Sequence, residues 1–221
     1  MDKERLFALL ATQDAPTLLA LLSRAYDQMQ YDQREAVFGE FDRSLPPAPV
    51  EAEALLEEVE AFQRVSLAGM YYAPFAINSK NFMHIPDETK EWFDKLGDLL
   101  TASFQLSARG DHMHAAACFS ILYELIDAME DGEEIVFAHE YGSWMIPGNE
   151  QEFIAAYMTS LATLATPEEY AAVALPLIQR DSLQSFTTQA YAAAISAAND
   201  AQRAHLESEV RQRNIKTGRT P

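Results

Sequence analysis

Residues 87–130 read DETKEWFDKLGDLLTASFQLSARGDHMHAAACFSILYELIDAME and carry the clearest structural signal in the chain. On both sides of Gly110, large apolar residues recur every three or four positions, which is the spacing of one helix face. Glycine suits the left-handed position just past a helix end, and Asp111 can cap the helix that follows. The stretch therefore predicts two helices joined by a tight turn. Their apolar stripes would contain Trp92, Phe93, Leu96, Leu99, Leu100, Phe104, Phe119, Leu122, Ile126 and Met129.

The same helical spacing continues in both directions from this pair. The sequence therefore predicts an all-α fold of about ten helices in antiparallel pairs, arranged as an irregular α-solenoid or a compact helical bundle. The helix starts are irregularly spaced, so no repeat consensus is expected. Residues 133–141 could also form a strand because of Ile135-Val136-Phe137, but helix is favoured. The other expected helices cover about 2–12, 14–29, 31–44, 51–72, 149–165, 166–180 and, as one long helix, 181–206.

Proline marks the clearest break in this helical pattern. The stretch Leu45-Pro46-Pro47-Ala48-Pro49 cannot continue a helix. The expected organisation is a single helical domain over residues 1–210, with a sub-boundary at 45–50. Residues 211–221 turn polar and basic and are expected to form a tail that frays.

Charge is the unusual part of the composition. The chain has 34 acidic residues against 16 lysines and arginines, a net charge of −18, and residues 51–160 alone carry −15. Such a surface repels nucleic-acid phosphates and anionic membranes, so neither is expected as a partner. It suits a protein partner, a basic one in particular, or a metal ion. Acidic helix faces can also serve solubility alone.

The location expected from the sequence is cytoplasmic. The N-terminal stretch MDKERLFALLATQD has charges of both signs and too short an apolar run for a secretory signal. No segment approaches the roughly 20 apolar residues of a membrane span. Cys118 is the single cysteine and lies in an apolar helical run, which predicts a buried, unreactive thiol.

Two irregular segments, 73–86 and 142–148, interrupt the helices. Long loops in compact proteins often carry function, and aromatics mixed with amides and a lysine are typical of a recognition surface. The same composition also fits loops that their aromatics pin to a core. Tyr72, Phe75 and Phe82 are expected to pack inward and hold the polar turn between them. The candidate binding residues are Asn78, Lys80, Asn81, His84, Tyr141 and Trp144.

A metal centre is the alternative site, because imidazole and carboxylate groups suit zinc, iron or manganese. The spacing argues against it: neither HExxH nor ExxH occurs, and the rings of His112 and His114 point about 200° apart on a helix. Only tertiary contact could bring the ligands together. The candidate ligands are His84, His112, His114, His139 and Glu140.

These observations favour a non-enzymatic helical module that binds another protein through its acidic central region. No cofactor is expected, and there is no nucleophile elbow, CxxC pair or glycine-rich phosphate loop. One alternative is a metal-dependent enzyme using the histidine and glutamate residues. The other is an acidic inhibitor or immunity-type protein that neutralises a basic partner.

Overall fold

The computed structural model describes residues 2–29, 33, 37, 51–82, 84–137, 145–180 and 184–217. Helix makes up 73% of these described residues, and none of them lies in a strand, which confirms the all-α prediction. The chain divides into two compact units, residues 1–47 and 48–221. Within the described ranges, no helix combines the length and the apolar run needed to cross a lipid bilayer.

The first unit contains α1 (Lys3–Leu10) and α2 (Ala15–Gln28). Asp14 caps the start of α2: its carboxylate accepts a hydrogen bond from the Thr17 amide at 2.9 Å, and Pro16 lies in the first turn. Contacts with Thr17 hold the pKa of Asp14 below its usual value. None of the side chains described between residues 2 and 29 is buried.

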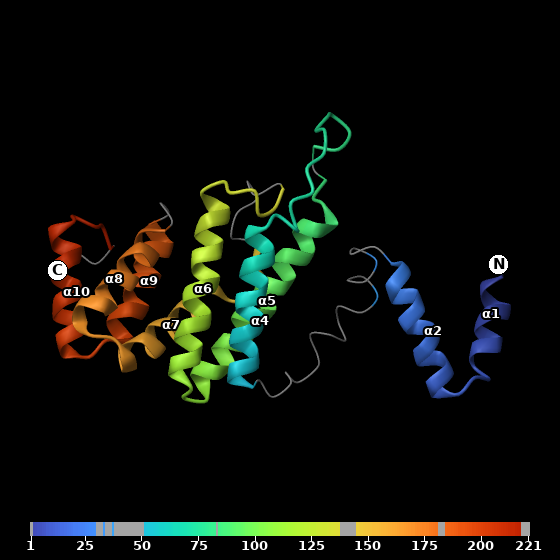
Figure 1. Ribbon diagram of the computed structural model, residues 1–221, viewed down its shortest axis with the longest axis horizontal. Helices are drawn as coiled ribbons and strands as arrows, with labels where there is room; N and C mark the ends of the chain where they lie inside the picture. The colour runs from blue at the N-terminus through green and yellow to red at the C-terminus, as the bar shows by residue number, and fades with distance from the viewer. Residues whose placement is uncertain are drawn as a thin grey trace. The chain divides into compact units, whose positions relative to one another are not determined.

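The second unit is a stack of helices around one core. Each helix contacts helices one or two places away in the chain, from α4, α5 and α6 through α7 to α8, α9 and α10 (Figure 1). This pattern of local contacts is typical of stacked antiparallel helices. The bounds are α4 Ala52–Leu67, α5 Asp87–Ala108, α6 His112–Glu130, α7 Glu150–Leu164, α8 Pro167–Gln179, α9 Gln184–Ala197 and α10 Asp200–Gln212.

The predicted helix pair α5–α6 forms the centre of this core. Gly110 adopts φ 84°, and the amides of Gly110 and Asp111 donate to the carbonyls of Ser107 and Leu106, which closes α5. The expected stripes are buried, except that Phe104 is half-buried. Trp92 is completely buried, and its indole N–H donates to the Ser66 hydroxyl of α4 at 2.9 Å.

Cys118 of α6 is completely buried, as expected, and burial raises the pKa of its thiol to about 11. A thiol with so little thiolate, screened from solvent, reacts slowly. We expect Ellman's reagent to modify the native protein far more slowly than the protein unfolded in guanidinium. Equal rates in the two states would contradict the buried position.

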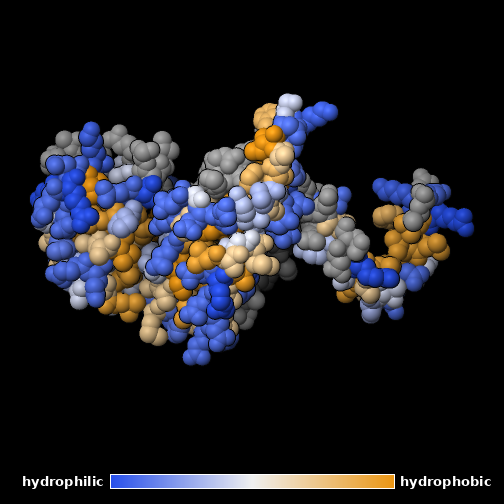
Figure 2. Space-filling model, turned by 45° about the horizontal axis from the view of Figure 1, so that its top comes forward, coloured by the Kyte–Doolittle hydropathy of each residue, from blue (hydrophilic) through white to orange (hydrophobic). Residues whose placement is uncertain are grey.

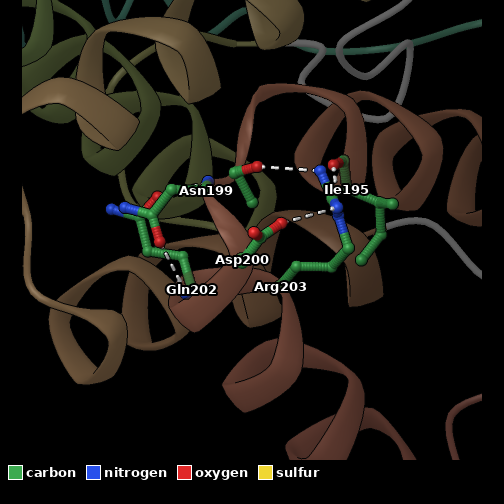
Figure 3. Close-up of polar contacts among 6 residues, drawn as sticks. Ile195, Asn199, Asp200, Gln202 and Arg203 are labelled. Atoms are coloured by element: carbon green, nitrogen blue, oxygen red, sulfur yellow. Dashed lines mark hydrogen bonds and ion pairs between the residues drawn. The ribbon is translucent and has the colours of Figure 1, made fainter.

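The C-terminal helices differ from the prediction. The single helix expected over 181–206 is wrong, because the chain turns at Ala198-Asn199 between α9 and α10. Asn199 and Gln202 form a capping box, and the guanidinium of Arg203 donates to the carbonyls of Ile195, in the last turn of α9, and of Ala198, the residue just past it (Figure 3). These groups satisfy the helix ends at the break.

Gln202 also ties α10 to α7. The side chain is completely buried, and its Nε2 donates to the carbonyls of Ala162 and Ala165 at 3.1 and 2.8 Å. These carbonyls belong to the end of α7, where backbone acceptors have no partner within the helix. Gln202 therefore closes one helix while it caps the start of another.

Other helix boundaries also differ from the prediction. α4 ends at Leu67 instead of 72, because Gly69 takes φ 73° and turns the chain. The helix expected over 133–141 is wrong over 133–137, which forms turns with Ile135 and Val136 buried. The helix expected over 31–44 lies outside the described residues apart from Gln33 and Val37. Past α10, Ile215 packs against the core.

Candidate functional site

The 73–86 loop projects from the second unit between α4 and α5 (Figure 1). Aromatic contacts fix its base. The Phe137 ring lies edge-on to Tyr72 and Phe75, with centroids 6.1 and 5.1 Å away, and Phe75 also meets the ring of His84 at 5.3 Å. The buried hydroxyl of Thr89 donates to the Phe137 carbonyl at 2.7 Å. The loop therefore leaves the core from an ordered base.

The tip of the loop is a turn held by its own side chains. The Asn81 carboxamide oxygen accepts from the Asn78 amide at 2.6 Å, and its Nδ2 donates to the Ala76 carbonyl at 3.0 Å. The Asn78 carboxamide oxygen accepts from the Lys80 amide at 2.9 Å. These asparagines satisfy backbone groups of the turn, as such residues often do. Their first role is to fix the shape of the loop.

Two apolar side chains are displayed on this turn. Ile77 and Phe82 are 59% and 65% exposed, and Lys80 beside them is exposed as well. The projecting loop shows both apolar and hydrophilic surface in Figure 2. Tyr72 and Phe75 are half-buried at the base, as expected, but the inward packing expected for Phe82 is wrong. The side-chain hydrogen bonds of Asn78 and Asn81 hold the turn, so Phe82 is not required to anchor it. An exposed phenylalanine on an ordered turn is a surface that a partner could cover.

An acidic edge borders the base of the loop. Glu130, Asp131, Glu133 and Glu134 follow one another at the end of α6, and all four are exposed. Their segment leads directly to Phe137, whose ring touches the loop aromatics. The loop and these carboxylates therefore lie on neighbouring parts of the surface.

The structure describes residues 145–148 of the second irregular segment. Tyr141 and Trp144 lie outside the described residues, so their predicted role in binding stays a prediction. Pro147 lies against Gly97 of α5: a Cβ atom added to Gly97 would come within 2.9 Å of its ring. Glycine at position 97 therefore lets this segment approach the helix closely.

The candidate metal ligands go to separate partners. His112 Nδ1 lies 3.3 Å from the Ser160 hydroxyl of α7, and His114 Nδ1 lies 2.8 Å from the Asp111 carboxylate. His84 packs on Phe75 in the loop. His139 and Glu140 fall outside the described residues. Among the residues with described positions, no three histidine, cysteine or carboxylate side chains converge on a point that could hold a metal ion.

Sequence reasoning missed a buried polar chain that begins at His112. The Ser160 hydroxyl donates to Ser107 at 2.9 Å, and the Ser107 hydroxyl donates to the Ala156 carbonyl at 3.1 Å. The chain ties α5, α6 and α7 together. Ser160 is completely buried, so it cannot meet a substrate from solvent. Its arrangement is that of a structural network, which only tertiary contact reveals.

Sequence reasoning also missed a buried arginine at the end of α8. The Arg180 side chain is 5% exposed; its Nη2 lies 2.7 Å from Asp127 and its Nε 3.3 Å from Glu130, both on α6. The guanidinium stacks over the Tyr123 ring at 5.1 Å. Burial and the nearby Glu150 raise the pKa of the Tyr123 hydroxyl. Charge, stacking and burial together lock α8 onto α6.

Comparisons with family models, curated sequences and solved structures gave no match. In the described part of the chain, the 73–86 loop combines an ordered backbone with displayed apolar groups, whereas the buried polar clusters serve packing.

The loop geometry separates the roles of two neighbouring residues. Asn81→Ala removes two hydrogen bonds of the turn, so we expect faster amide exchange at Asn78 and a loss of about 1 kcal/mol of stability. Lys80→Ala changes only an exposed side chain and should alter stability by about 0.5 kcal/mol or less. Exchange measured by NMR and denaturant unfolding check both. Equal effects of the two changes would contradict the assigned roles.

Proposed function

We propose that this chain is a protein-binding module that recognises a basic partner through the 73–86 loop and the acidic edge beside it. The observation that carries the proposal is the exposure of Ile77 and Phe82 on a turn fixed by Asn78 and Asn81. An ordered turn loses little conformational entropy when it binds, and a buried aromatic side chain is a common centre of binding energy.

Charge defines the partner that fits this surface. The edge formed by Glu130, Asp131, Glu133 and Glu134 stands beside the loop, and residues 51–160 carry a net charge of −15. A basic protein would be drawn to this field, and its approach would slow as salt screens the charges. In this arrangement the apolar side chains of Ile77 and Phe82 supply affinity. The carboxylates steer the approach and favour a partner with positive charge.

Site-specific crosslinking tests this proposal in extract of the source cells. A photoreactive phenylalanine analogue replaces Phe82 in one variant and Met113 of α6 in the control; the two native side chains are similarly exposed, at 65% and 63%. We expect position 82 to capture one predominant basic protein that position 113 does not, with less capture at high salt. No product at position 82, or the same products at both positions, would contradict the proposal.

A further inference from the structure

The first unit displays a concentrated set of apolar side chains. Within residues 2–29, the exposed ones are Leu6, Phe7, Leu9, Leu19, Leu22 and Tyr26. Leu19, Leu22 and Tyr26 follow one another by three and four residues, so they form one stripe along α2. Figure 2 shows apolar surface on both of these helices. We call α1 and α2 together the N-terminal helix pair.

These helices need an apolar partner to be stable. α1 and α2 have 8 and 14 residues, and isolated helices of about that length are marginal in water. The two helices diverge from the turn that joins them (Figure 1), and their six large apolar side chains stay exposed. The absence of any buried side chain among those described in residues 2–29 agrees with this.

The charge of the helix pair points to a second copy of the chain. Residues 2–29 carry four acids and three bases, so their net charge is −1, and the remaining residues carry −17 of the total of −18. A basic partner would be drawn to the acidic remainder, not to this nearly neutral face. Acids and bases alternate from Asp2 to Arg5, which allows two copies to match opposite charges across a two-fold axis.

The exposed area is also sufficient. Aromatic side chains bury about 150–250 Å² each and leucines somewhat less, so complete burial of the exposed fractions of these six side chains gives at most on the order of 500 Å² per copy. Two copies would then bury roughly 1,000 Å², the size at which specific interfaces begin. We propose that the N-terminal helix pair is a homodimerisation element, in which the pairs of two chains combine into a four-helix bundle. This inference does not depend on the proposed partner of the 73–86 loop.

Sedimentation equilibrium of the full chain tests the proposal. We expect a dimer, and the double variant Leu19→Ala, Leu22→Ala should weaken it at least about a hundredfold, because symmetry removes four leucines from the interface. The control pair Met113→Ala and Leu164→Ala shortens side chains of similar exposure in the second unit and should leave the dimer unchanged. A monomeric wild-type protein, or a dimer equally affected by both pairs, would overturn the proposal.

Hydrogen exchange of the wild-type protein tests the proposal even if the double variant loses its N-terminal helices. In the wild-type protein, amides of α1 and α2 should exchange more slowly as protein concentration rises, because dimerisation protects them. Exchange that is independent of concentration would overturn the proposal.

Added salt should leave the dimer intact or strengthen it, since salt screens repulsion between the acidic remainders of the two chains. Salt-induced dissociation would indicate a charge-driven contact instead and would also count against it.

Discussion

Replacing Arg180 by methionine is expected to lower the free energy of unfolding by about 3 kcal/mol, because it breaks a buried ion pair. Methionine keeps much of the apolar contact with Tyr123 but removes the charge that Asp127 and Glu130 face at 2.7 and 3.3 Å. The effect should lie at the low end of the range for buried pairs, since the Asp127 side chain is about half-exposed.

Denaturant unfolding measures this loss, and Arg213→Met is the matched control. Arg213 pairs with Glu209 one turn earlier on the surface, so its replacement should cost about 0.5 kcal/mol or less. Similar losses in the two variants would show that burial adds nothing to the Arg180 pair.

The effect of Arg180→Met should depend on pH. Burial raises the pKa of Asp127 above its ordinary value of 3.8; Arg180 opposes the rise, and Glu130, Asp131 and Glu124 add to it. A carboxyl whose pKa is raised in the native state holds its proton more readily there, so the native state loses stability as pH rises through that window. Removing Arg180 raises this pKa further. The difference in unfolding free energy between the wild-type protein and Arg180→Met should therefore shrink as pH falls from 7 towards 4. A difference that stays constant over this range would contradict the assigned interaction with Asp127.

Replacing Gln202 by methionine is expected to cost about 3 kcal/mol. The change keeps the volume of the side chain but leaves the carbonyls of Ala162 and Ala165 without their donor and removes half of the Asn199 capping box. A buried polar group without a partner costs about 1–3 kcal/mol, and two are created here. Figure 3 shows how closely this junction is held by its own side chains.

The matched control for Gln202 is Gln212→Met in the last turn of α10. Gln212 is exposed and donates only to the Ser208 hydroxyl at 3.2 Å, so its loss should cost about 0.5 kcal/mol or less. Thermal and denaturant unfolding compare the two variants. A Gln202 variant as stable as the control would mean that water replaces the lost bonds at no cost.

Local patterns predicted the centre of the fold well. The stripe from Trp92 to Leu100 and the stop at Gly110 depend on residues near one another in sequence, and the structure confirms both. The break at Asn199 was missed because the alanine-rich run favours helix throughout. The signal was nonetheless present: Asn199 followed three residues later by Gln202 is a capping-box spacing.

The candidate site was harder to predict, because its chemistry depends on distant contacts. The asparagines of the loop could be recognised from sequence as turn residues, but the exposure of Phe82 depends on what the core leaves uncovered. Arg180 pairs with Asp127 and Glu130, which lie about fifty residues earlier in the sequence, and no short motif predicts such a pairing. Histidines that cluster in sequence likewise separated onto different partners.

The affinity for the partner captured at position 82 tests the central claim most directly. Titration calorimetry compares the wild-type protein with Phe82→Ala and with Met113→Ala, which truncates a side chain of similar exposure elsewhere on the same unit. Burial of Phe82 at the centre of the interface predicts that Phe82→Ala weakens binding by about tenfold or more, while Met113→Ala leaves it unchanged. Equal affinities of all three proteins would contradict recognition through the 73–86 loop.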